Sequence, residues 1–154
     1  MNNKRLELYN HYITELSAYN PELAKEKNST INGWATSYIK EGNWIDIVGD
    51  SGQLCGFLII SSLPEDCHPD CDWYICQAYV IPEYREQGFM TNAVFKFIRN
   101  NPGIYGFDIL RGNDYAEKFW LNIFKKIRAE KVELSRLRAN SLEDNLELYG
   151  FLVK

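Results

Sequence analysis

The residue types best suited to bind an anion lie together in a short turn past the middle of the chain. Arg85 and Gly88 stand three positions apart, between a β-prone run that Pro82 ends and a helical run that begins at Phe89. A helix N-terminus presents unpaired N–H groups and a partial positive charge, so it attracts phosphate. A guanidinium adds charge, and glycine lets the backbone approach a ligand closely. The spacing therefore suits a phosphate-binding turn, but taken alone it is more often a solvated arginine beside an ordinary glycine turn.

Four cysteines form a second group of reactive side chains, within the 22 positions from Cys55 to Cys76. Cys67, His68 and Cys71 offer soft metal ligands, but the paired C-x₂-C spacing of structural zinc sites is missing. The N-terminus has no apolar leader, so an oxidising compartment and a disulfide are not expected. We therefore expect no bound metal and reduced thiols, with Cys76 packed in a strand as a small apolar side chain.

The turn lies within a predicted strand, helix and strand. Residues 73–81 are β-prone and apolar on both faces, residues 89–99 keep helical spacing, and residues 105–110 form another short apolar run. A unit of this kind is expected to have parallel strands and a right-handed crossover.

Further helices and strands are expected on both sides of this unit. Apolar spacing and turn residues mark them, and Asp114 with Glu117 resembles a capping box at the start of the last helix. The expected elements are helices over residues 6–16, 31–39 and 114–127, a hairpin over residues 44–61, and strands over residues 131–134 and 146–153.

Length and composition favour one compact domain over residues 1–154. The chain has 154 residues, of which 45% are apolar, and this is enough for one core. A net charge of −4 disfavours nucleic-acid binding through bulk electrostatics. No run of 18 apolar residues occurs, so we expect a cytoplasmic protein that does not cross a membrane.

The segment from Tyr79 to Met90 resembles the cofactor segment of the GNAT superfamily of acyltransferases. The family pattern is Arg or Gln, two residues, Gly, one residue, then Gly or Ala, after a strand that ends in a Val-x-Pro-like turn. Arg85 and Gly88 match this pattern, while Met90 stands in place of the last small residue. The resemblance is therefore specific in its context but incomplete at Met90.

A second stretch, from Asn113 to Phe124, resembles the helix Asn-x-x-Ala-x-x-x-Tyr-x-x-x-Gly-Phe of the same family. Asn113, Ala116 and Phe124 match, whereas Trp120 replaces the Tyr and Ile123 replaces the Gly. The order of elements from residue 30 onward also follows the family.

The resemblance implies an α+β fold of the acyl-CoA N-acyltransferase (GNAT-like) type, with a mixed central sheet flanked by helices. It implies acetyl-CoA as cosubstrate, with pantetheine on the backbone of the central strand and the diphosphate over the N–H groups of the turn. The cofactor-binding residues that it implies are Tyr79, Val80, Arg85, Gln87, Gly88, Phe89, Met90, Thr91, Asn113 and Trp120.

The groups that would move protons are less evident. An amine with a pKa of ~10.4 must lose a proton before it attacks a thioester. Gln77 is an amide and cannot accept that proton, so Asp72 is the weak catalytic candidate, with an exposed loop carboxylate as the favoured alternative. His68 is expected to be a solvated loop residue. Trp120 stands where the family has an acidic Tyr and is expected to pack in the core.

The favoured function is an N-acetyltransferase that moves an acetyl group from acetyl-CoA to an amine. The alternative is a catalytically impaired CoA-binding module of the same fold with a regulatory or interaction role, and a third is a purely structural protein. The acceptor is expected to be a small molecule or peptide amine. Asp66, Asp70 and Asp72 would suit a cationic amine, although such loop carboxylates are usually solvated. A homodimer is one of the oligomeric states left open.

Overall fold

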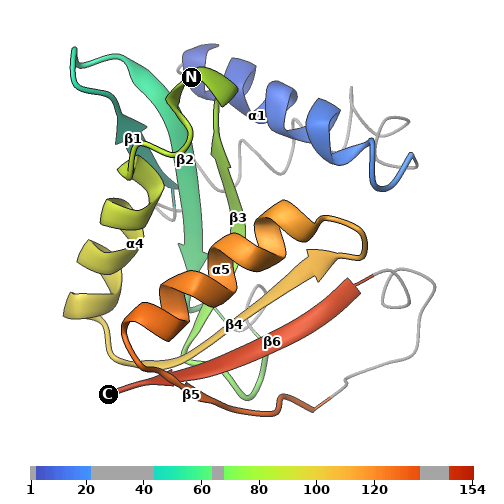
Figure 1. Ribbon diagram of the computed structural model, residues 1–154, viewed down its shortest axis with the longest axis vertical. Coiled ribbons are helices and arrows are strands. Elements are labelled where there is room, and N and C mark those ends of the chain that lie inside the picture. Colours follow the sequence, from blue (N-terminus) through green and yellow to red (C-terminus); the bar gives the residue numbers. More distant parts are fainter. Residues whose placement is uncertain (1–2, 22–43, 64–67, 136–145) are drawn as a thin grey trace. The chain divides into compact units, whose positions relative to one another are not determined.

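The fold is a mixed sheet of six strands flanked by helices. It is seen in a computed structural model that describes residues 3–21, 44–63, 68–135 and 146–154. The strand order is β1-β2-β3-β4-β6-β5. The elements, in chain order (Figure 1), are α1 (Asn3–Leu16), β1 (Trp44–Val48), β2 (Leu54–Ser61), β3 (Trp73–Val80), the 3₁₀ turn η1 (Pro82–Tyr84), α4 (Phe89–Asn100), β4 (Gly103–Leu110), α5 (Asp114–Lys126), β5 (Glu130–Lys131) and β6 (Leu146–Val153).

The chain divides into two compact units. Unit 1 comprises residues 1–59 and 77–96, and unit 2 comprises residues 60–76 and 97–154. The boundaries fall within β2, β3 and α4, so these elements contribute residues to both units. A single domain over residues 1–154 stays a prediction.

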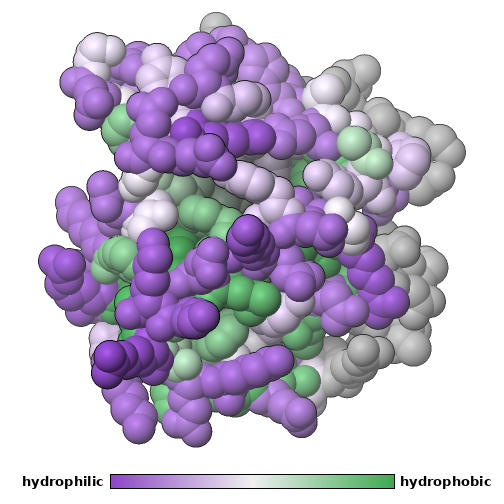
Figure 2. Space-filling model, in the orientation of Figure 1, coloured by the Kyte–Doolittle hydropathy of each residue, from purple (hydrophilic) through white to green (hydrophobic). Residues whose placement is uncertain are grey.

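Unit 1 is built on a hairpin and a helix joined by aromatic packing. β1 and β2 pair antiparallel from Trp44↔Ile59 onward, as the sequence predicts. Tyr9 of α1 packs on Trp44 and Phe57, with ring centroids 6.2 Å and 5.8 Å away. Arg5 of α1 also holds Asp46 of β1 through two hydrogen bonds of 2.9 Å and 2.7 Å. The surface of α1 that faces the viewer in Figure 2 is mostly hydrophilic, in keeping with its solvent side.

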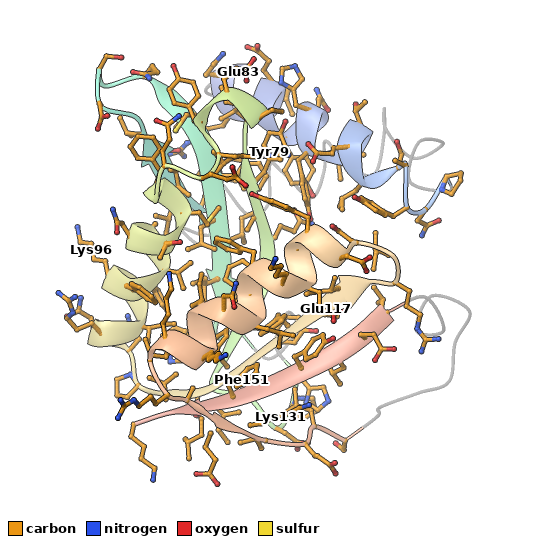
Figure 3. The ribbon with its side chains drawn as sticks, viewed as in Figure 1. Tyr79, Glu83, Lys96, Glu117, Lys131 and Phe151 are labelled. Carbon is orange, nitrogen blue, oxygen red and sulfur yellow. The ribbon has the colours of Figure 1, made fainter. Side chains whose placement is uncertain are left out.

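Unit 2 is built on β4 and its neighbours, with α5 packed on one face. β4 pairs with β6 antiparallel along its whole length and with the start of β3 in parallel, from Trp73↔Tyr105 to Ile75↔Phe107. Phe124 of α5 stacks on Phe107 at 5.6 Å and on Phe151 at 4.5 Å between ring centroids. Figure 3 labels Phe151 on β6, next to α5. The predicted parallel strands are therefore confirmed.

Several expected bounds differ from the structure by one to three residues. The strand expected over residues 131–134 is short and covers Glu130–Lys131, and the strand expected from residue 105 begins at Gly103. The residue that caps α5 is Asn113, one position before the predicted capping box. The helix expected over residues 31–39 lies outside the described residues. None of the helices in the described ranges is long and apolar enough to cross a membrane.

Candidate functional site

The turn from β3 to α4 forms the start of a helix with backbone N–H groups available. The N–H of Asn92 is the first to close a helical turn, onto the carbonyl of Gly88 at 2.9 Å. Helix geometry therefore leaves the N–H groups of residues 88–91 without an acceptor inside α4. The resemblance implies the N–H groups of Gln87 to Thr91 as diphosphate donors, and four of these five, from Gly88 to Thr91, belong to this helix start.

Gly88 combines an unusual backbone conformation with open space where a side chain would begin. Its φ of 87° lies in the left-handed region, which disfavours L side chains. A Cβ at this position would meet one described atom within 4 Å, Nδ2 of Asn92 at 3.9 Å. The space next to Gly88 is therefore open as far as the described residues show.

The side chains of the residues beside Gly88 make contacts within unit 1. Met90, which departs from the family pattern, is 8% exposed and packs into the core. Phe89 lies against Tyr84, with ring centroids 6.3 Å apart, and the Gln87 amide donates to the Glu83 carbonyl at 2.9 Å. The larger residue at position 90 is therefore accommodated in the core.

Arg85 contacts Val80, Glu15 and Tyr79 in unit 1. Its Nε donates to the Val80 carbonyl at 2.8 Å, and its Nη2 lies 2.6 Å from a carboxylate oxygen of Glu15 in α1. Its guanidinium also lies over the Tyr79 ring, 5.5 Å from the centroid. Burial, and then the Glu15 charge, raise the pKa of Tyr79. The cation that the sequence predicts for a phosphate is thus paired with a carboxylate.

The backbone of β3 near its end is oriented by Gly56. A Cβ on Gly56 would lie 2.3 Å from the Tyr79 carbonyl oxygen, so only glycine admits this close approach. The Tyr79 carbonyl therefore faces Gly56 of β2, while the Val80 carbonyl receives Arg85. The role of Tyr79 and Val80 in binding pantetheine stays a prediction. In the same unit, the buried amide oxygen of Gln77 has no hydrogen-bond partner among the described residues.

Asn113 and Trp120 have structural roles in unit 2. The Asn113 side chain accepts the Ala116 N–H at 3.3 Å and so caps α5. Trp120 is 7% exposed and packs against Phe107, with ring centroids 5.8 Å apart. Core packing of Trp120 agrees with the expectation from its apolar stripe, and cofactor contacts of these two residues stay predictions.

Asp72 and His68, the two expected loop residues, differ in burial. Asp72 is exposed, as expected, and its carboxylate accepts the Ile104 N–H at 2.8 Å, which fixes the start of β3. The expectation that His68 is solvated is wrong, because His68 is 8% exposed. Its Nε2 lies 2.6 Å from the Ser135 carbonyl, and its Nδ1 accepts the Asp70 N–H at 3.1 Å, so the proton resides on Nε2.

The cysteine cluster is described in part. Cys67 and Asp66 lie outside the described residues. Within the described ranges, no group of three or more His, Cys, Asp or Glu side chains could hold a metal ion. Asp70 is engaged elsewhere, because the Ser135 N–H and hydroxyl donate to it and lower its pKa.

Sequence reasoning missed a pair in unit 2, the Tyr74 hydroxyl and the Asp108 carboxylate. Tyr74 donates to Oδ2 of Asp108 at 2.5 Å. Burial raises the pKa of Asp108, and the hydrogen bond from Tyr74 opposes that rise. Asp108 keeps exposed surface, which moderates the effect of burial. The signal for this pair was a lone carboxylate in the apolar run Gly103–Leu110.

The same pair keeps Tyr74 protonated and in place. Burial, and then the Asp108 charge, raise the pKa of Tyr74. At Gly106 a Cβ would lie 3.0 Å from the Tyr74 ring and 2.4 Å from Sγ of Cys71, so a larger residue would displace the ring. Unit 2 therefore holds a carboxylate that can accept a proton, together with a phenol that orients it.

The comparisons with known proteins agree with the fold. E. coli YjaB in its apo form has a TM-score of 0.60 at 15% identity, over 98% of this chain and 91% of that one. An acetyltransferase of the GNAT family from Listeria monocytogenes 4b F2365 has 0.58 at 14% identity, over 99% and 91%. One from Bacillus anthracis has 0.61 at 13% identity, over 97% and 89%. At these identities the likeness shows the fold alone. No curated protein sequence matches the chain.

The mixed sheet, its helices and these neighbours define the acyltransferase fold of GNAT proteins. Residues 6–125 match the sequence family described as Acetyltransferase (GNAT) family, which is well over half of the chain. The chain belongs to this family.

Proposed function

We propose that the protein is an N-acetyltransferase that transfers the acetyl group of acetyl-CoA to an amine. The observation that carries the proposal is the start of α4 in unit 1. There Gly88 takes a φ of 87° and leaves open space beside it, ahead of the first helical bond at Asn92. Backbone N–H groups at a helix start stabilise a diphosphate through hydrogen bonds and the helix dipole.

The other cofactor residues of unit 1 follow from their chemistry. Arg85 adds a cation beside the same turn, and Thr91 adds a hydroxyl. The β3 backbone at Tyr79 and Val80 would pair with the pantetheine. The buried oxygen of Gln77 has no described partner, and a buried acceptor of this kind favours a ligand N–H, which pantetheine amides supply.

Acyl transfer needs one proton acceptor. In the proposed reaction the amine nitrogen bonds to the thioester carbonyl carbon, the C–S bond breaks, and CoA leaves as thiolate. Among the described residues of unit 2, Asp108 has the chemistry of such an acceptor, because burial raises its pKa and Tyr74 fixes its orientation, and we propose it as the candidate base. A thiol with a pKa near ~8.5 is a good leaving group and takes its proton from solvent. Asp72, the earlier candidate, instead fixes β3 through Ile104.

A CoA-binding module without catalysis is the second candidate function. It is favoured by Trp120, which packs in the core of unit 2 and offers no acidic proton. A cytoplasmic location and a small-molecule or peptide amine acceptor remain part of the main proposal.

Two measurements test the proposed function. A ligand at 100 times its dissociation constant stabilises a fold by ~2.7 kcal/mol, so acetyl-CoA should raise the melting temperature. Thiol release should then depend on added amine, with a polyamine, a lysine peptide and a neutral amine compared. No thermal shift and no calorimetric signal at millimolar acetyl-CoA would overturn both candidates. A shift without amine-dependent thiol release across the panel would favour the binding module.

A further inference from the structure

The contact between Arg85 and Glu15 in unit 1 has a consequence for cofactor binding. We propose that Glu15 of α1 competes with the cofactor's diphosphate for Arg85, so that cofactor binding releases the end of α1. The proposal rests on the proposed function, in which acetyl-CoA binds at the start of α4. It makes Glu15 a positioning residue that lowers acetyl-CoA affinity and couples α1 to the occupied state.

The ion pair is well formed. Nη2 of Arg85 lies 2.6 Å from Oε2 of Glu15, while the two side chains are 25% and 44% exposed. The same guanidinium donates to the Val80 carbonyl at 2.8 Å. A diphosphate that takes a charged hydrogen bond from Arg85 must therefore share or displace the Glu15 carboxylate, since both anions seek the same donors.

Glu15 needs a cation more than most surface carboxylates do. It lies in the last turn of α1, where the helix dipole places partial negative charge, and α1 carries no basic residue in that turn. A carboxylate at this end of a helix is unfavourable unless a cation compensates it. Arg85, which follows Glu15 by 70 positions in the sequence, supplies that compensation.

Aromatic packing extends the effect of this ion pair into α1. Tyr12, one turn before Glu15, lies 5.9 Å from the Tyr79 ring between centroids, and Arg85 covers Tyr79 at 5.5 Å. Arg85 therefore touches α1 through its carboxylate partner and through the ring that α1 packs on. Withdrawal of Arg85 toward a diphosphate would loosen both contacts, and the last turn of α1 would fray.

Other carboxylates in the region provide a control for plain repulsion of an anionic ligand. Glu83 is exposed in the η1 turn and lies with Tyr79 at the same end of β3 (Figure 3). The Glu83 charge, like that of Glu15, contributes to the raised pKa of Tyr79. A charge change at Glu83 leaves the Glu15 carboxylate in place, so Glu83→Gln tests repulsion of the ligand by a neighbouring charge.

The experiment is a double-mutant cycle on acetyl-CoA affinity at ~0.15 M salt, where repulsion between separated surface charges is largely screened. Calorimetry would compare the wild type with Glu15→Gln, Arg85→Ala and the double variant, and with Glu83→Gln as control. Glu15→Gln removes the exposed ion pair with Arg85, so its affinity for acetyl-CoA should be about two- to five-fold higher than that of the wild type. Arg85→Ala should lower the affinity for acetyl-CoA, and the double variant should have the same affinity as Arg85→Ala.

Hydrogen exchange supplies a readout that a purely structural role would not move. Acetyl-CoA should speed amide exchange in the last turn of α1 in the wild type and have no such effect in Glu15→Gln. The inference is overturned if Glu15→Gln leaves affinity unchanged or weaker, if its gain persists with Arg85→Ala, or if Glu83→Gln gives the same gain. A wild type that does not bind acetyl-CoA would instead overturn the proposed function, and this inference with it.

Discussion

The two ends of β3 present opposite chemistry, and each end belongs to a different unit. At its C-terminal end, in unit 1, the groups near Gly88 are donors: helix N–H groups and the guanidinium of Arg85. At its N-terminal end, in unit 2, the Asp108 carboxylate is an acceptor that Tyr74 orients. Donors stabilise an anionic cofactor, and a carboxylate with a raised pKa suits proton transfer. The difference suggests that binding and proton transfer can be damaged separately.

The largest expected effect is loss of cofactor binding in Gly88→Val. A β-branched side chain would occupy the space beside the first N–H groups of α4, and salt cannot relieve a steric block. Acetyl-CoA affinity should fall by more than ~100-fold, which is beyond the ~2.7 kcal/mol that two decades represent. Calorimetric titration at low and high salt is the measurement.

Gly52 provides the matched control for this change. Its φ is 83°, and a Cβ there would meet no described atom within 4 Å, so its backbone strain resembles that of Gly88. Both valine variants should lose ~1–3 kcal/mol of stability, but Gly52→Val should keep acetyl-CoA binding. Normal binding by Gly88→Val would mean that this turn does not hold the cofactor.

The next effect concerns turnover at the other end of β3. Asp108→Asn removes the proposed proton acceptor while keeping an oxygen for Tyr74, so amine-dependent thiol release should drop about 10²-fold or more. Acetyl-CoA affinity should stay close to that of the wild type. The acid limb of the kcat/KM profile, set by the raised pKa of Asp108, should disappear.

Asp72→Asn is the control for that variant. Asp72 is exposed and holds the Ile104 N–H, so its change should lower stability slightly and leave the pH profile intact. If Asp108→Asn leaves the rate of thiol release unchanged and Asp72→Asn removes the acid limb of the kcat/KM profile, the base is Asp72 and not Asp108.

The donor end of β3 could be predicted from sequence because its signals are local. Gly88, the helix start at Phe89 and the strand before Pro82 lie within a few residues, and apolar spacing fixes their order. The cap of α5 was misplaced by one residue because Asn113 and Asp114 are both good caps. Local patterns thus give elements and turns, with errors of about one residue at the ends.

The acceptor end could not be predicted because it depends on distant partners. Tyr74 meets Asp108 across 34 positions, and this contact exists only once β3 and β4 pair in register. His68 is buried because Ser135, 67 positions away, accepts its ring N–H. Similarly, Arg85 meets Glu15 across 70 positions. Polar residues in loops carry no periodic signal, so their burial follows from tertiary packing alone.

The smallest effect is a difference in how stability depends on pH within unit 2. The folded pKa of Asp108 is raised, so its contribution to stability is present at low pH and is lost as pH rises through that pKa. Asp70 is the opposite case: its lowered folded pKa gives stability that is present above the unfolded value near ~3.9 and lost at lower pH. Asp108→Asn should therefore melt slightly higher than the wild type near neutral pH and equal to it near pH ~3. Asp70→Asn should melt lower near neutral pH, with the gap closing in acid. Melting curves from pH ~3 to ~8 are the measurement. If both variants change the melting temperature in the same direction near neutral pH, burial does not govern the pKa of the Asp108 carboxyl.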